Sequence, residues 1–245
     1  MARAKWAGRL GGIAKYLGLG AVIVGFSGAT LARYDIVAKL PGFGGIAVGL
    51  LLAAIGFVVA VLALLIGMGK TGATRKPAVW GLVLSGAYLG VIASYMIPAA
   101  DYPPIHDATT DLANPPEFAV LPMREDNLVG VGTIENWQKI HAEAFPDLKP
   151  VTIAKPVAEV IADADRIAKG RGWTVAAADP DHGRFEATAY AAYIRFRDDV
   201  VLRVVPSEDG ASSTIDMRSV SQVGGGDLGY NANRVRSFLK ELQGD

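Results

Sequence analysis

The longest apolar stretch of the chain covers residues 40–69 and contains no Asp, Glu, Lys, Arg or His. A helix crosses the hydrocarbon core of a bilayer with about 20 apolar residues, so this stretch is long enough to span with some tilt. Because backbone groups without partners are costly in lipid, such a stretch crosses as a helix. Two more apolar runs, residues 16–32 and 79–97, lie on either side. The pattern predicts three membrane-spanning helices.

Beyond residue 98 the pattern changes. Residues 99–132 contain five prolines and no clear period, which predicts an extended segment laid over the domain that follows. Helical spacing then predicts helices at 134–145, with Thr133 as N-cap, at 156–169 and at 227–242. Between the last two helices, alternation with period two predicts strands at 173–178, 184–196, 200–205 and 214–219.

The turns between the predicted strands are short, which favours antiparallel neighbours. In the last strand Ile215 and Met217 alternate with polar residues, so one sheet face is apolar and is expected to be covered by helices. The fold class is therefore a membrane α-helical part of three spans plus an α+β extramembrane domain, with an antiparallel sheet of about four strands and two to three helices.

The predicted domain boundaries follow these changes in pattern. Residues 1–98 form the three-helix transmembrane domain, 99–132 the extended Pro-rich segment and 133–245 the α+β domain. We expect residues 133–245 to fold without the spans, because their helices and strands can bury one core.

The formal net charge of zero conceals two opposite halves. Residues 1–98 hold nine Lys or Arg and one acid, whereas residues 99–245 hold 15 Lys or Arg and 23 acids. Such acidity argues against a nucleic-acid partner, whose phosphates require a positive surface. The chain has no cysteine, which excludes disulfides, thiolate metal sites and cysteine nucleophiles. No cofactor is predicted.

The basic residues in the short segments predict the orientation. Four precede the first span, two (Arg33 and Lys39) follow it, and three (Lys70, Arg75 and Lys76) separate the second span from the third. Because positive segments stay in the cytoplasm, the N-terminus is expected inside and residue 99 onward outside. The N-terminal run resembles a signal peptide but lacks a clean cleavage site, so we interpret it as an uncleaved helix. In a bacterium this is a multi-pass inner (cytoplasmic) membrane protein with a periplasmic domain.

Two spans carry glycines four residues apart, at Gly45 and Gly49 and at Gly86 and Gly90. Such spacing lets helix backbones approach closely. It serves either packing within the chain or packing against the helix of a partner.

The candidate ligand site is the strand-to-helix connection Gly224, Gly225, Gly226 and Asp227, with Arg218 and Arg234 nearby. A glycine-rich loop entering a helix offers free N–H groups to a phosphate or carboxylate. The alternative is a structural turn in which Asp227 itself caps the helix. The charged strand residues are expected to share the polar sheet face: Arg184, Glu186, Arg203, Asp216 and Arg218. They either bind a ligand together or pair with one another across strands.

The histidines do not form a metal motif in the sequence, so no metal site is predicted. His106 is the histidine with two carboxylates alongside, Asp107 and Asp111. No catalytic residue is assigned, because no recognised catalytic constellation is present.

Several ordered motifs resemble a known family: residues 102–111 with 114–116, 183–188, 198–203, and 218–224 continuing through 227–234. Together these residues, roughly 100–242, resemble the uncharacterised family catalogued as domain of unknown function 1499. The resemblance implies a membrane-tethered domain in bacteria and plastids, with no established activity. Gln222 and Gly225 stand where basic residues are expected, which weakens a ligand argument at that loop.

Two functional hypotheses follow. The first is a non-enzymatic envelope protein, anchored in the lipid bilayer, whose periplasmic α+β domain binds a membrane or periplasmic protein partner or a small ligand. The alternative is a periplasmic hydrolase-like enzyme that uses His106, Asp107 and Asp111 with Arg218.

The charge bias gives a direct test of orientation. A reporter that is active only in the periplasm should be active when fused after Asp245 and inactive when fused after Gly69, because Lys and Arg hold their segments inside. Activity in the opposite pattern would overturn both the orientation and the localisation.

Overall fold

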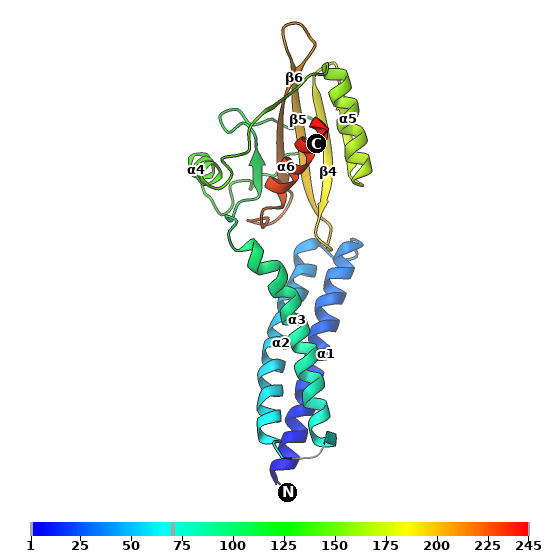
Figure 1. Ribbon diagram of the computed structural model, residues 1–245, viewed down its shortest axis with the longest axis vertical. Helices are drawn as coiled ribbons and strands as arrows, with labels where there is room; N and C mark the ends of the chain where they lie inside the picture. Colours follow the sequence, from blue (N-terminus) through cyan, green and yellow to red (C-terminus); the bar gives the residue numbers. More distant parts are fainter. Residues whose placement is uncertain (1, 70–71, 245) are drawn as a thin grey trace. The chain divides into compact units, whose positions relative to one another are not determined.

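The computed structural model describes residues 2–69 and 72–244 (Figure 1). Lys70, counted above among the basic residues, lies outside the described residues. The chain divides into two compact units, one holding the residues up to Pro98 together with Tyr193–Arg195 and the other holding the rest.

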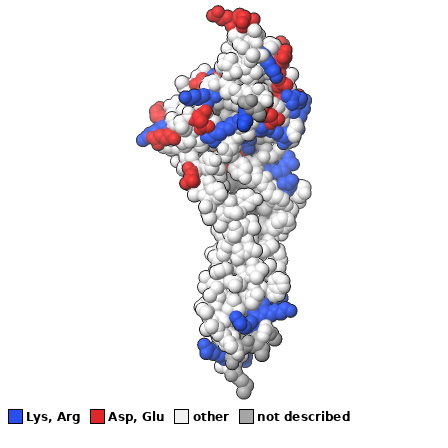
Figure 2. Space-filling model, viewed as in Figure 1, with Lys and Arg blue, Asp and Glu red and all other residues white. Residues whose placement is uncertain are grey.

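The first unit consists of three helices, α1 (Ala2–Arg33), α2 (Lys39–Ile66) and α3 (Gly72–Ala99). By length and composition each is able to cross a membrane, as the apolar runs predicted. Figure 2 shows a wide band without charged side chains over these helices. Their apolar outer surface is the one that lipid would solvate.

Small residues let α1, α2 and α3 approach closely. A methyl group added at Gly45 would lie 3.1 Å from both Gly28 Cα and Val24 O. Tyr88 of α3 packs against Gly25 and Gly49 and donates a hydrogen bond to Ile46 O at 2.9 Å. The glycine pair in α2 therefore packs within the chain. Methyl groups added at Gly86 and Gly90 of α3 would have more room, with Phe57 at 3.6 Å from the first and nothing within 4 Å of the second.

The second unit is built on an antiparallel sheet with strand order β1-β6-β5-β4-β3, in which β2 also pairs with β6. The strands are β1 (Asp107–Thr109), β2 (Val151–Ile153), β3 (Thr174–Asp179), β4 (Arg184–Ala191), β5 (Phe196–Pro206) and β6 (Ser213–Ser221). The antiparallel α+β fold is confirmed, with six strands in place of about four. The two additional strands, β1 and β2, have three residues each, which is too short for alternation to reveal them.

The prediction of one strand over residues 184–196 followed by a turn at 197–199 is wrong. The turn lies between Ala191 and Phe196, where Ala192 and Arg195 adopt positive φ values of 55° and 60°. No Gly, Pro or Asn lies in this turn, so no residue type indicated it. Asp198 and Asp199, which suggested a loop, are buried within β5.

Three helices complete the unit: α4 (Ile134–Ala144), α5 (Val157–Gly170) and α6 (Tyr230–Gln243). Thr133 caps α4 as predicted, accepting a hydrogen bond from Asn136 N at 3.2 Å. α6 begins three residues later than expected. α5 packs against β3, β4 and β5, and α6 against β6 and β1. The core between them is fully buried and includes Phe185, Leu202, Ile215, Met217 and Phe238.

Helix α4 closes the exposed edge of β1. Trp137 Nε1 donates to Asp107 O at 3.0 Å, and His141 Nε2 accepts from Thr109 N at 3.0 Å. An unpaired strand edge exposes backbone groups that would otherwise recruit another chain. Side chains of α4 therefore take the place of a neighbouring strand.

The register of β1 changes the fragment that we expect to fold independently. β1 pairs with residues 218–220 of β6, so a fragment of residues 133–245 lacks part of the sheet. We expect residues 100–245 to unfold cooperatively, and 133–245 to be less stable by at least about 2 kcal/mol, because buried backbone groups lose their partners. Urea unfolding of both fragments, followed by circular dichroism, measures the difference. Equal midpoints would show that β1 contributes nothing to the domain.

Candidate functional site

The charged strand residues project from the sheet face opposite α5 and α6. In the register Glu186 lies beside Val201 and Val201 beside Arg218, while Arg203 lies between Arg184 and Asp216. Cross-strand partners share a face, so these side chains lie together, as alternation predicted. This polar face is not open: residues 110–124, named here the covering segment, bind to it.

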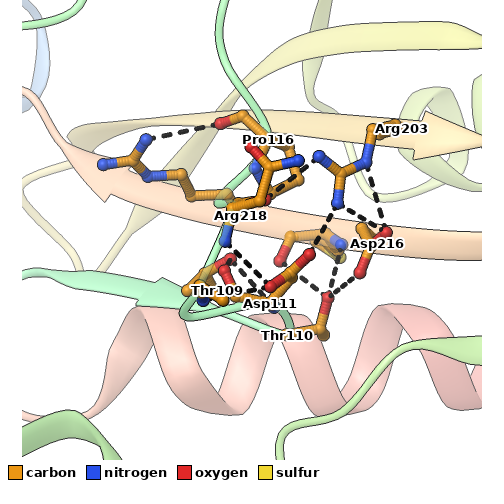
Figure 3. Close-up of polar contacts among 10 residues, drawn as sticks. Thr109, Thr110, Asp111, Pro116, Arg203, Asp216 and Arg218 are labelled. Atoms are coloured by element: carbon orange, nitrogen blue, oxygen red, sulfur yellow. Dashed lines mark hydrogen bonds and ion pairs between the residues drawn. The ribbon is translucent and has the colours of Figure 1, made fainter. Parts of the chain in front are cut away.

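Two arginines of the sheet hold the first part of the covering segment (Figure 3). Arg203 donates from Nη1 to Asn114 O at 3.0 Å and from Nη2 to Asp111 Oδ2 at 2.9 Å. Arg218 donates from Nη1 to Pro116 O at 3.3 Å. Backbone carbonyls of an irregular segment thus find donors on the sheet.

Glu186 of β4 holds the next part. It is fully buried, and its carboxylate accepts hydrogen bonds from the N–H groups of Ala119 at 2.7 Å, Val120 at 3.1 Å and Leu121 at 2.8 Å. Three such donors compensate a buried carboxylate for lost hydration. The covering segment is therefore fixed to the sheet by its own backbone.

Asp107 and Arg218 form a bidentate ion pair, in which Arg218 Nε donates to Asp107 Oδ1 at 3.0 Å and Arg218 Nη2 donates to Asp107 Oδ2 at 2.6 Å. The Asp107 side chain is 2% exposed and that of Arg218 is 12% exposed. Asn127 Nδ2 donates to Asp107 Oδ2 at 2.7 Å, and Asn127 Oδ1 lies 3.3 Å from His106 Nε2. The structure thus joins His106 to Asp107 through Asn127.

Asp111 and Asp216 both contact Arg203, whose Nη2 lies 2.8 Å from Asp216 Oδ2. Partial burial raises the pKa of Asp111, but hydrogen bonds from Asn114 N–H and Arg203 outweigh it and hold the pKa below its ordinary value. Thr110 Oγ1 donates to Asp216 Oδ1 at 3.2 Å. This second ion pair fixes the start of the covering segment.

Arg234 belongs to α6, on the other side of the sheet. Its Nη2 pairs with Asp198 Oδ2 at 2.6 Å and its Nη1 donates to Ser219 Oγ at 2.9 Å. Both charged side chains are buried. Asn231 bridges the same group, donating to His106 O at 2.9 Å and to Ser221 Oγ at 2.8 Å.

The glycine-rich connection is bound to the chain around it. Asp227 accepts from Gly229 N at 2.9 Å and from Asn231 N at 2.6 Å, so this carboxylate occupies the N-terminus of α6. Burial raises the pKa of Asp227 to about 6, although these hydrogen bonds act in the opposite direction. Arg124 Nη1 donates to Gly224 O at 2.8 Å. The residues Gly225 and Gly226 lie between these two attachments.

The structure therefore separates the residues proposed as one ligand site. Arg203 and Arg218 lie on the polar face, and Arg234 lies in α6 on the opposite face of the sheet. Residues 224–227 form the connection to α6. Arg218 pairs with Asp107, and Asp216 pairs with Arg203. Three of the four residues named in the hydrolase hypothesis lie close together, namely His106, Asp107 and Arg218. The fourth, Asp111, pairs with Arg203.

Two elements of this arrangement had no signal in the sequence. Asn127 gave no indication of its role between His106 and Asp107, and the covering segment gave no indication of which strand residues hold it. Within residues 2–69 and 72–244, no group of three or more His, Cys, Asp or Glu is placed to hold a metal ion.

A protein-family model described as "Protein of unknown function (DUF1499)" matches residues 107–242, more than half of the chain. The chain belongs to this family. The match extends from Asp107 to Leu242, so the DUF1499 region contains Arg203 and Arg218, the covering segment and the whole sheet. A comparison with curated proteins found no match, and neither did one with solved structures.

The contact of His141 with β1 predicts a pH dependence of the DUF1499 region. Burial lowers the pKa of His141 to about 4, and its Nε2 accepts a hydrogen bond that the protonated ring cannot accept. Stability from this group is complete above pH 6.5 and is lost as pH falls through 4, a total of about 3 kcal/mol. His141→Gln retains an acceptor without titrating, so it should flatten the loss of stability between pH 6.5 and 4.

The measurement is the thermal midpoint of the full chain in nanodiscs at each pH. Burial raises the pKa of Asp227 to about 6, so the contribution of Asp227 to the stability of the domain falls as pH rises. This dependence is opposite in sign to that of His141. The difference between parent and variant therefore isolates His141. His182→Gln, at an exposed hairpin residue that pairs with Asp179, is the matched control and should change the pH profile much less than His141→Gln, because an exposed ion pair contributes little. Equal profiles for His141→Gln and the parent would contradict the prediction.

Proposed function

We propose that this is a non-enzymatic, membrane-anchored envelope protein whose α+β domain binds a protein partner outside the cytoplasm, in the periplasm of a bacterium. The observation that carries the proposal is that exposed apolar side chains lie in the part of the covering segment whose backbone is bound by Glu186. Val120 is 60% exposed and Met123 is 38% exposed, although Glu186 holds the backbone at Ala119, Val120 and Leu121. Apolar side chains are thus presented to solvent on a fixed backbone.

A fixed backbone favours partner binding because less conformational entropy is lost on association. Because Glu186 binds three of its N–H groups, the backbone at residues 119–121 has little conformational freedom. Pro116 and Pro122 restrict the backbone further on either side. Exposed apolar residues on such a rigid loop are typical of contact sites for other proteins.

The charge pairs favour a protein partner over a small anionic ligand. Arg203, Arg218 and Arg234, the cations expected to attract an anion, each pair with a carboxylate within the domain. Binding an anion would require breaking a partly or fully buried pair, which is strongly unfavourable. The same pairs account for Asp107 and Asp111 without a catalytic role.

The proposal is tested by photocrosslinking in native membranes. A photoreactive amino acid in place of Val120 should give discrete crosslinked products, and the same replacement at Ile134 should not give them. Ile134 is the matched control because it is apolar and 55% exposed but belongs to α4. Adding Met123→Glu should reduce the crosslinked products severalfold, because the charge must be desolvated at the contact.

Two results of this experiment would contradict the proposal. Absence of products at Val120, or the same products at Val120 and Ile134, would mean that the covering segment is not a binding surface.

A further inference from the structure

Leu228 is presented to solvent by an unfavourable backbone conformation. Its φ is 55°, in the left-handed region that a branched apolar residue rarely adopts, and its side chain is 43% exposed. A residue held in such a conformation indicates a local requirement. Because much of the side chain is exposed, burial within the domain does not account for a leucine at this position.

The connection that carries Leu228 is tied to the start of the domain. Gly229 packs directly against the ring of Tyr102, and Asp227 N donates to Ile105 O at 3.2 Å. Tyr102 follows Ala99, the last residue of α3, by three residues, which span at most about 11 Å. The chain itself therefore keeps Leu228 close to the end of a membrane-spanning helix.

Two further exposed side chains belong to segments next to this connection. Tyr230, which follows on the other side of Gly229, is 39% exposed, and tyrosine is enriched at membrane–water interfaces. Val129 is 42% exposed and belongs to a neighbouring loop, since a methyl group added at Gly130 would lie 3.4 Å from Gly225 O. Leu228 lies in the connection to α6, Tyr230 is the first residue of α6, and Val129 lies in a loop that contacts the connection.

We propose that Leu228, Tyr230 and Val129 insert into the head-group region of the bilayer that α3 crosses, so that the domain docks on the lipid surface. The docking requires α3 to span, but it depends neither on the side of the membrane nor on the proposed protein partner. Acidic residues on the same loops, Glu125 and Asp126, give no attraction to anionic lipids. The contact is therefore an apolar one, expected with zwitterionic lipid.

Because the chain has no cysteine, single cysteines give a clean test. Full-length Leu228→Cys carrying an environment-sensitive fluorophore is reconstituted in phosphatidylcholine vesicles with and without a lipid bearing a nitroxide near its head group. The matched control is Val205→Cys, an apolar residue 48% exposed and paired with Thr214, roughly 23 Å along β6 from Ser221. Quenching at residue 228 should exceed that at 205 severalfold.

A second pair of variants separates docking from folding. Asn tolerates positive φ, so Leu228→Asn should keep the fold and remove the insertion. A label at Val129→Cys should then lose most of its quenching, with the thermal midpoint in detergent unchanged or raised. Equal quenching at 228 and 205, full quenching at 129 in Leu228→Asn, or quenching that requires anionic lipid would each overturn the proposal.

Discussion

The domain depends on pairing charges that its own fold removes from water. Glu186, Asp107 and Asp198 are almost completely buried, and each is compensated by a different means: backbone N–H groups, Arg218 and Arg234. An uncompensated buried charge is strongly destabilising, whereas a compensated one adds little net stability. Such groups therefore act mainly on specificity, because alternative placements of the covering segment or of α6 would leave a charge without its partner.

The same requirement connects distant parts of the sequence. Asp107 precedes Arg218 by more than a hundred residues, yet their ion pair, the β1–β6 ladder and the contacts of α4 meet at one strand. β1 has three residues and could not persist alone. It is held on one side by β6 and on the other by Trp137 and His141, so a short strand becomes an integral part of the domain.

Periodicity predicted what depends on local pattern. The three apolar helices, Thr133 as N-cap, the apolar face with Ile215 and Met217, and the α+β class follow from spacing. The turn at 192–195 could not be predicted, because Ala192 and Arg195 adopt positive φ without a residue that favours it. Asp198 was misinterpreted as part of a loop, since its partner Arg234 lies on a helix far along the chain. The site residues were chosen by chemical type, and chemical type does not show which carboxylate a guanidinium meets.

Polar alternation in a strand normally indicates a solvated face. Here Glu186 and Arg218 alternate with core residues but point into a second, polar layer formed by the covering segment. Because that segment has an irregular backbone, it needs hydrogen-bond partners that a sheet interior cannot offer, and charged strand side chains provide them. The charged strand side chains thus supply the hydrogen-bond partners that the backbone of the covering segment needs. It follows that the exposed side chains they position, such as Val120, are better candidates for function than the charges themselves.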